Sequence, residues 1–352
     1  MAGPTLIRLR RLWFTVHMWI GVGLLVVLVP LTLSGVVLAW RPELDRATHP
    51  ERYAGLHQGP PLGPAALIAA ASQAFGPEAT VDRLNFAAQP DAPVVATLAG
   101  PGGRRSAWID PATGKVLAKG RLSDPMIVLA HDLHEQLFLP RFGRLVVGIL
   151  GLFLLTQVLT GLWLWWPRSG GVLEGLSWRR SRFLDARVHY LVGFCSAIPL
   201  AILAATGALL AFSVHAPAPR RPVPNVVFWA HPLTPKPVDA DQALATARQL
   251  SPGARIATIF LPNPGTPAWR IQLLPPAGTG PVTVRVPADG SAPGLAPSGA
   301  SDPVSLWSGR LHAGDTLGPV WRWIITLGGL APTLLAVTGL LQWLRGRGRP
   351  TS

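Results

Sequence analysis

Four long apolar stretches limit what this chain can fold into more than any other feature of the sequence. A bilayer core of about 30 Å needs roughly 20 apolar helical residues, and each stretch is long enough. With 49% hydrophobic and 14% charged residues, the composition favours a membrane protein over two soluble domains. We therefore expect a membrane all-α four-helix bundle. The expected spans are Leu12–Trp40, Leu145–Trp166, Val188–Phe212 and Ile324–Leu344.

The first span follows three arginines, Arg8, Arg10 and Arg11, in the manner of a secretory signal peptide. It is too long for a signal core, and no small-x-small cleavage site follows it. We interpret it as a helix that is retained.

The basic residues predict the orientation. Segments 1–12, 167–187 and 344–352 hold 11 Lys or Arg among 42 residues, whereas loops 41–130 and 216–311 hold 17 among 186. The positive-inside rule then places the N- and C-termini and the short middle loop in the cytoplasm, and both long loops outside. Because the net charge of +14 lies mostly beside apolar runs, we expect contact with the lipid bilayer and no nucleic-acid partner.

Each long loop is predicted to hold a small α+β module. A short helix is expected at Pro64–Phe75 in the first loop and at Asp239–Leu250 in the second, followed by alternating strand-like runs. A hairpin is expected at Ala107–Leu117, turning at Asp110 to Gly114, with a weaker echo at Val282–Ser291. Neither loop clusters His, Cys or paired carboxylates, so binding, shielding or docking are the expected roles.

The two halves of the chain repeat each other with the same direction across the membrane. This pattern predicts a parallel duplication with a pseudo-twofold axis along the membrane normal. In the first and third spans, His17, Gly21 and Ser34-Gly35 match His189, Gly193 and Thr206-Gly207. In the second and fourth, His134, Arg144, Gly151 and Thr160-Gly161 match His312, Arg322, Gly329 and Thr338-Gly339.

The axis is expected to bring His17 opposite His189 toward the cytoplasmic side, and His134 opposite His312 toward the outside. The second pair falls in amphipathic extensions that precede the apolar cores of their spans. Two facing imidazoles without a carboxylate or cysteine fit the axial positions of a haem iron better than a zinc or calcium site. Cys195 is the lone cysteine and is interpreted as a small buried apolar residue.

Chain direction places Gly161 and Gly339 near the cytoplasmic histidines, and Gly35 and Gly207 near the outer ones. Each missing side chain would leave room for a flat macrocycle, although close helix packing explains such glycines equally well.

Other polar residues leave alternatives open. His131 lies on nearly the same helical face as His134 and is a rival outer ligand, but it has no counterpart before His312. Arg144 and Arg322 would pair with haem propionates or extend toward lipid headgroups. Solvent exposure is the expected fate of the remaining loop histidines, which are His49, His57, His215 and His231.

The expected organisation alternates membrane and loop segments. The membrane segments are helix 1 at 1–40, helix 2 with an amphipathic start at 131–167, helix 3 at 188–213 and helix 4 with an amphipathic start at 309–345. Between them lie the first outer module at 41–130, a cytoplasmic loop at 168–187, the second outer module at 214–308 and a cytoplasmic tail at 346–352.

The sequence resembles the PepSY-associated transmembrane family, which includes bacterial inner-membrane ferrisiderophore reductases and other iron-regulated membrane proteins. The resemblance covers nearly the whole chain. It depends on the His-x-Trp-x-Gly start at His17, the hairpin end from Asp110 to Leu117, the Leu133-His134 helix start and the Thr160 to Arg168 exit. The second outer module departs from the family pattern, because it is Pro-rich and lacks the full hairpin signature.

The resemblance implies four helices, two periplasmic PepSY modules and, in reductase members, two b-type haems. It makes His17, His134, His189 and His312 the candidate ligands, in agreement with the repeat. The chain shows no Gly-rich dinucleotide fingerprint after a strand.

We therefore expect a one-electron conduit. A cytoplasmic-side or membrane donor would reduce the haem at His17 and His189, the electron would pass to the haem at His134 and His312, and a ferric siderophore or other periplasmic iron chelate would accept it. One alternative is another acceptor for the same haems. Another is a haem-free anchor that binds or restrains a periplasmic protein such as a peptidase.

Overall fold

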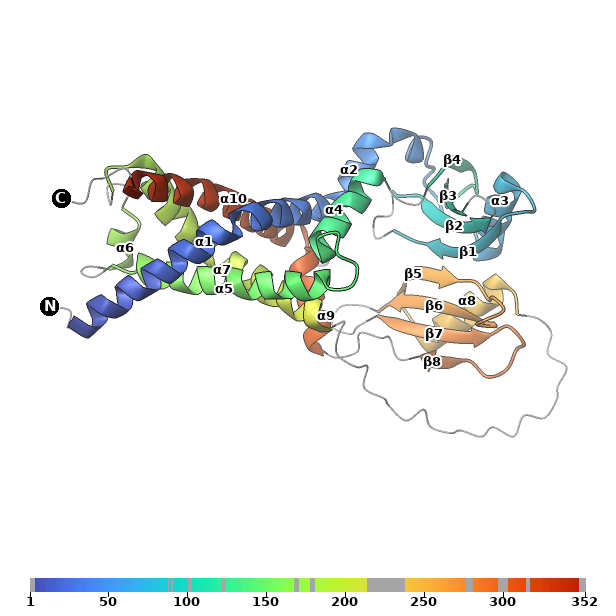
Figure 1. Ribbon diagram of the computed structural model, residues 1–352. Coiled ribbons are helices and arrows are strands. Elements are labelled where there is room, and N and C mark those ends of the chain that lie inside the picture. The colour runs from blue at the N-terminus through green and yellow to red at the C-terminus, as the bar shows by residue number, and fades with distance from the viewer. Residues whose placement is uncertain are drawn as a thin grey trace. The chain divides into compact units, whose positions relative to one another are not determined.

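The computed structural model describes most of the chain, and it separates into two compact units that we describe one at a time (Figure 1). The first consists of Met1–Arg41, Pro125–Pro217 and Val304–Ser352, and the second of Pro42–Asp124 and Ala218–Pro303. His215 and His231, and the start of the expected second module, fall outside the described residues. Those residues are 4–87, 89, 91–100, 103–121, 124–167, 171–177, 181–213, 238–275, 281–296, 303–314 and 317–347.

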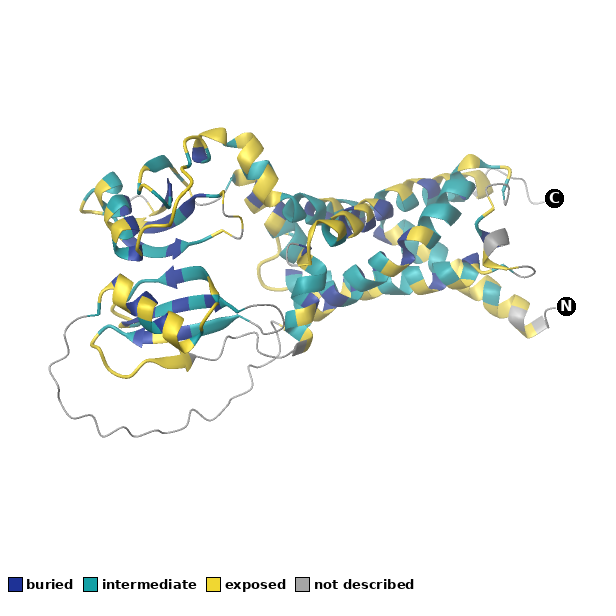
Figure 2. Cartoon of the chain, turned by 180° about the vertical axis from the view of Figure 1, so that it is seen from behind, coloured by how far each residue is buried: buried dark blue, intermediate teal, exposed yellow. Residues whose placement is uncertain are grey.

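The first unit is built on four long helices, which confirm the four expected spans. They are α1 (Pro4–Ala39), α5 (Gly143–Trp165), α7 (Leu184–Ser213) and α10 (Pro319–Arg347), and each is long and apolar enough to cross a bilayer. Exposed segments recur along these helices (Figure 2). Their large exposed apolar side chains include Val26, Ile198 and Leu327, and Cys195, which was expected to be buried, is exposed as well. An extensive exposed apolar surface on helices of this length is typical of contact with lipid.

The long helices of this unit form a ring. Helix α1 packs against α5 and α10, and α7 packs against the same two helices, so α1 and α7 occupy opposite corners. The remaining described helices of the unit are α4 (Pro125–Gln136), the four-residue α6 (Val172–Gly175) and α9 (Pro303–Ala313).

The expected amphipathic starts of spans two and four are separate helices, which corrects the sequence prediction. Leu137 and Phe138 have φ of 49° and 58° and end α4, so the chain turns before α5 begins at Gly143. A side chain at Gly143 would lie 1.8 Å from the carbonyl oxygen of Gln136, so only glycine allows this close elbow. In the second half, Gly314 with φ of 79° ends α9 in the same way. The expected module boundary at residue 130 falls inside α4.

The second unit contains a single antiparallel sheet of eight strands in the order β4-β3-β2-β1-β5-β6-β7-β8. The sequence predicted two modules, and the structure joins them through β1 and β5 into one sheet with a shared core. The first-half strands are β1 (Thr80–Asn85), β2 (Val94–Gly100), β3 (Gly103–Ile109) and β4 (Val116–Gly120). The second-half strands are β5 (Arg255–Phe260), β6 (Ala268–Leu274), β7 (Val282–Pro287) and β8 (Gly294–Ala296).

The sheet is symmetric about its centre. Arg83 pairs with Phe260, and Asn85 pairs with Thr258. Residues 83 and 258 are equivalent positions 175 residues apart, and so are residues 85 and 260, so each pair repeats the other with the two halves of the chain exchanged. Leu84 and Ile259 pair with each other at the symmetry point. The register shift in β1 after Val81 recurs in β5 after Ile256, at the same offset.

Two short helices pack on one face of this sheet and confirm the sequence prediction. They are α3 (Pro64–Phe75) and α8 (Ala240–Leu250), and Asp239 caps α8 by accepting a hydrogen bond from the backbone nitrogen of Gln242. Leu67 of α3 and Leu244 of α8 join Leu84, Ile259 and their neighbours in one hydrophobic core. The two predicted hairpins are also present, as β3–β4 and β7–β8.

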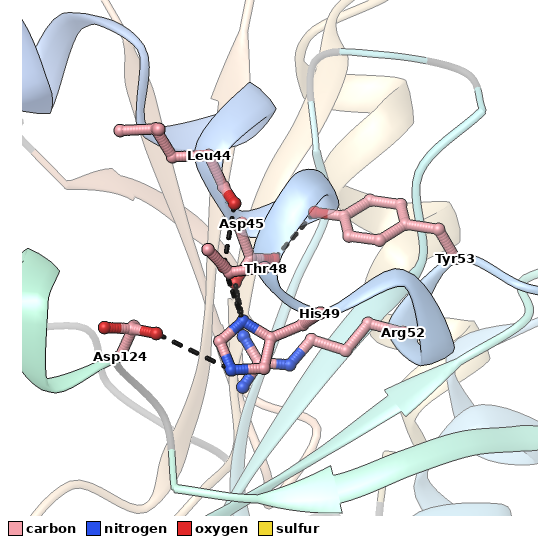
Figure 3. A network of polar contacts seen from close by, with 7 residues as sticks. All are labelled: Leu44, Asp45, Thr48, His49, Arg52, Tyr53 and Asp124. Atoms are coloured by element: carbon pink, nitrogen blue, oxygen red, sulfur yellow. Dashed lines mark hydrogen bonds and ion pairs between the residues drawn. The ribbon is translucent and has the colours of Figure 1, made fainter.

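A polar network anchors the start and end of the first-half module (Figure 3). It lies around helix α2 (Arg41–Thr48) and the 3₁₀ turn η1 (Pro50–Arg52). Asp45 accepts hydrogen bonds from the Arg52 guanidinium and from the Tyr53 hydroxyl at 2.8 Å. His49 lies 3.6 Å from the carboxylate of Asp124, which immediately precedes α4. The contact between His49 and Asp124 joins the first residues of the module to its last residue.

Candidate functional site: paired histidines in the helical bundle

The structure brings the four repeated histidines together in two pairs. His17 of α1 and His189 of α7 have ring centres 6.4 Å apart, with the rings almost perpendicular at 89°. His134 of α4 and His312 of α9 have ring centres 5.9 Å apart, with an angle of 41°. Each pair therefore takes one imidazole from each half of the chain.

Each histidine rests on a Ser/Thr-Gly step from its own half. The Nδ1 atom of His17 lies 2.9 Å from the Thr160 hydroxyl, and that of His189 lies 2.9 Å from the Thr338 hydroxyl. His312 Nδ1 lies 3.1 Å from the hydroxyl of Thr206.

His134 makes the equivalent contact, except that a backbone carbonyl is its nearer partner. Its Nδ1 lies 2.8 Å from the carbonyl oxygen of Leu31 and 3.4 Å from the Ser34 hydroxyl.

The hydroxyls fix which ring nitrogen carries the proton. Thr160, Thr206 and Thr338 each donate their hydroxyl proton to a carbonyl four residues earlier, at 2.7, 2.6 and 2.7 Å. A hydroxyl has one proton, so toward the histidine its oxygen can only accept. The imidazole must then donate from Nδ1, which leaves Nε2 as the bare nitrogen. The Leu31 carbonyl imposes the same tautomer on His134, because a carbonyl only accepts.

The glycines of these steps make room for imidazole rings. A Cβ atom at Gly35 would lie 2.6 Å from Cε1 of His134, and one at Gly207 would lie 2.9 Å from Cε1 of His312. The corresponding distances are 3.0 Å between Gly161 and His17 and 3.4 Å between Gly339 and His189. We expected this space for a macrocycle, and the histidine edge fills it instead.

The two pairs lie at opposite ends of the bundle. His17 and Ser34, which contacts His134, are separated by 17 residues of α1, and the same spacing separates His189 from Thr206 on α7. At 1.5 Å per residue the pairs are about 25 Å apart along the helices, most of the thickness of a hydrocarbon core.

This donor set fits a haem iron. Two opposed imidazoles on one metal, each with a bond of about 2 Å, place the ring centres roughly 6 Å apart, close to both observed distances. Among the described residues, no group of three or more His, Cys, Asp and Glu side chains could hold a metal ion. A metal held by either pair would need further donors from a ligand, and haem would supply them.

Other predicted residues have protein partners. Arg144 forms an ion pair with Glu135 at 2.8 Å, and Arg322 donates to the Ala39 carbonyl at 2.7 Å and stacks on Trp40. His131 has a half-exposed side chain and lies 3.0 Å from Glu135, so the structure pairs His134, and not His131, with His312.

Sequence reasoning missed one polar residue beside the inner pair. Gln157 lies one turn before Thr160, and a Cβ at Gly21 would lie 2.7 Å from its amide nitrogen. Its buried Oε1 has no hydrogen-bond partner among the described residues. Leu335 occupies the equivalent position in the second half, so the two halves differ here. This difference between the repeats is the sequence signal that could have identified Gln157.

Fold and site together define a polytopic membrane protein with two histidine pairs in its helical unit. A family model described as the PepSY-associated TM region matches residues 14–346, and the chain belongs to that family. No protein with a curated function matches the sequence.

Proposed function

We propose that this protein is a di-haem b electron-transfer protein of the bacterial inner membrane, and that it reduces ferric siderophores on the periplasmic side. One observation carries the proposal. Each cross-half histidine pair has ring centres roughly 6 Å apart, and each Nδ1 lies within 3.1 Å of a hydroxyl or carbonyl oxygen, an arrangement that leaves Nε2 for a metal. Holding Nδ1–H with an acceptor is the usual way that proteins orient a metal-bound histidine.

In this proposal His17 and His189 hold one haem b, and His134 and His312 hold the other. A haem held by two imidazoles would supply one-electron transfer. Ser34, Thr160, Thr206 and Thr338 orient the rings. Gly35, Gly161, Gly207 and Gly339 let each ring approach its helix.

The two halves act as duplicated units. The recurrence of the histidine and Ser/Thr-Gly positions, and the symmetric pairing of β1 with β5, support a parallel repeat with one PepSY-like module in each half. The duplication brings the equivalent histidines of the two halves together in pairs.

The distribution of Lys and Arg supports cytoplasmic termini. The sheet unit is then periplasmic, the pair of His17 and His189 lies toward the cytoplasm, and the pair of His134 and His312 lies toward the periplasm. The electron donor is a cytoplasmic-side or membrane reductant. The acceptor is a ferric siderophore or another periplasmic iron chelate, which releases its metal once the iron is ferrous.

A reduced-minus-oxidised absorption spectrum of the purified full-length protein, reconstituted with haem, tests the proposal. We expect the bands of a six-coordinate b-type haem and their reoxidation by a ferric siderophore. A spectrum without haem bands would overturn the proposal and favour a haem-free anchor that binds a periplasmic protein. If haem bands appear but no ferric chelate reoxidises them, the haem part of the proposal stands and the ferric chelate is rejected as the acceptor.

A further inference from the structure

One face of the eight-stranded sheet carries a row of arginines that the proposed haem sites do not use. Arg83 of β1 pairs directly with Phe260 of β5, Phe260 with Arg270 of β6, and Arg270 with Arg285 of β7. Directly paired residues point to the same face, so these four side chains form a continuous row across four neighbouring strands.

The row lies on the face opposite α3 and α8. The neighbours of these residues along the strands, including Leu84, Ile259, Ile271 and Val284, are fully buried in the core beneath the two helices. Successive side chains of a strand alternate between faces, so the row points away from that core.

The charges in the row are not balanced. Asp82 is the only acidic residue in the eight strands, and it lies 3.7 Å from Arg83 and 3.6 Å from Arg104. Arg270 and Arg285 are directly paired like charges, an arrangement that destabilises a sheet when no counter-ion lies between them.

The guanidinium groups also have unused donors. The buried Nε atoms of Arg83 and Arg270 have no hydrogen-bond partner within the described part of the chain. Both guanidinium groups stack on the Phe260 ring, at 5.6 and 4.8 Å from its centre. By contrast, Arg52 at the far end of the sheet is engaged by Asp45. Asp82 lies beside Arg83 at one end of the row, whereas among the described residues no carboxylate forms an ion pair with Arg270 or Arg285, next to the Phe260 ring.

We propose that the row of Arg83, Phe260, Arg270 and Arg285 binds a polyanionic ferric chelate of the catecholate class. Guanidinium donors suit clustered anionic oxygens, and a central aromatic ring suits a ligand whose oxygen donors are carried on aromatic rings. Four strands spaced about 4.8 Å apart make a row of roughly 14 Å, the scale of a small molecule rather than of a protein interface. The identification of this ligand as the substrate rests on the proposed reductase function.

Binding to the full-length protein in detergent can be measured calorimetrically with a redox-inert probe. The probe is the gallium(III) complex of a hexadentate tris-catecholate, which is a trianion. The matched control is the gallium(III) complex of a hexadentate trihydroxamate, which presents six oxygen donors without net charge. We expect the trianion to bind and the neutral complex not to bind.

Variants locate the site. Arg270→Gln and Arg285→Gln should each weaken binding of the trianion about tenfold, the loss expected for one charge-assisted hydrogen bond. Arg248→Gln removes the same charge from the exposed surface of α8, on the opposite face, and should bind like the wild type. Arg285 is exposed, so its variant is expected to fold even if Arg270→Gln does not.

Wild-type affinity in Arg285→Gln, an equal loss in Arg248→Gln, or equally tight binding of the neutral complex would overturn the proposal. Displacement by equimolar inorganic phosphate would also overturn it, because the row would then be a general anion site. Gallium is not reduced, so binding without any haem spectrum would reject only the reductase function. A haem spectrum without binding would reject only this site.

Discussion

His17 of α1 and His189 of α7 face each other from opposite corners of the helical ring, with ring centres 6.4 Å apart and Nδ1 of each ring on a threonine hydroxyl. At the other end of the bundle, His134 and His312 have ring centres 5.9 Å apart. The roles of the hydroxyls, the glycines and the sheet can therefore be tested separately.

The threonine hydroxyls should control haem affinity. Thr160→Val removes the acceptor of His17 Nδ1–H, and loss of such a partner typically lowers metal affinity 10- to 100-fold. Thr156→Val is the matched control, because the Thr156 hydroxyl bonds only the carbonyl of Leu152 on its own helix. Titration of the reconstituted variants with haem measures the effect. Equal haem affinity in both variants would show that the hydroxyl does not orient the ligand.

The effect of replacing each glycine by alanine should depend on the space around that glycine. An alanine at Gly35 would place Cβ 2.6 Å from His134, whereas at Gly339 the distance to His189 is 3.4 Å. Gly35→Ala should therefore disturb the outer haem spectrum, and Gly339→Ala should have a much smaller effect on the inner one. Gly23, with no atom within 4 Å of a built Cβ, provides the neutral control. The absorption spectrum of each variant separates the cases, and a reversed order would contradict the geometry.

The shared sheet should make the two outer modules one cooperative unit. Leu84→Ala leaves a cavity at the symmetry point and should cost about 2–5 kcal/mol of unfolding free energy. Because Ile259 pairs with Leu84, amide hydrogen exchange should accelerate in β5 and β6 as well as in β1. Leu295→Ala, at an exposed position of β8, should change little. Acceleration confined to the first half would mean that the modules unfold independently.

Asp110 should make the stability of the sheet unit depend on pH. Burial opposes its ionisation, but hydrogen bonds from Thr113, His57 and the Ala112 backbone outweigh burial and lower the pKa of this carboxyl below its ordinary value. A lowered folded pKa contributes stability above the unfolded pKa of about 3.9, and this stability is lost as the pH falls through the folded pKa.

Thermal unfolding of the wild type and of Asp110→Asn tests this prediction. The wild type should be more stable near neutral pH, and the difference should shrink below about pH 4. A difference that stays constant across this range would assign the effect to packing rather than to charge.

Much of this architecture could be predicted from the sequence, because apolar length, turn residues and duplication are local or periodic signals. The spans, helices α3 and α8, and the turn at Asp110 belong to this group. The elbow at Leu137 and Phe138 could not be predicted, since neither residue favours positive φ and the tertiary fold imposes it.

The fusion of the two modules was also hidden, because a pairing between β1 and β5 depends on contacts far apart in sequence. At the site, the repeat indicated which histidines would meet. It did not indicate that the glycines accommodate imidazole edges, or that Arg144 and Arg322 have protein partners.

The haem content of single-histidine variants tests the central claim most directly. If each cross-half pair holds one haem, the reconstituted wild type should bind two haems per chain, and His17→Ala and His134→Ala should each bind one. The double variant should bind none. A wild type that binds no haem, or a His17→Ala variant that retains both haems, would contradict the pairing.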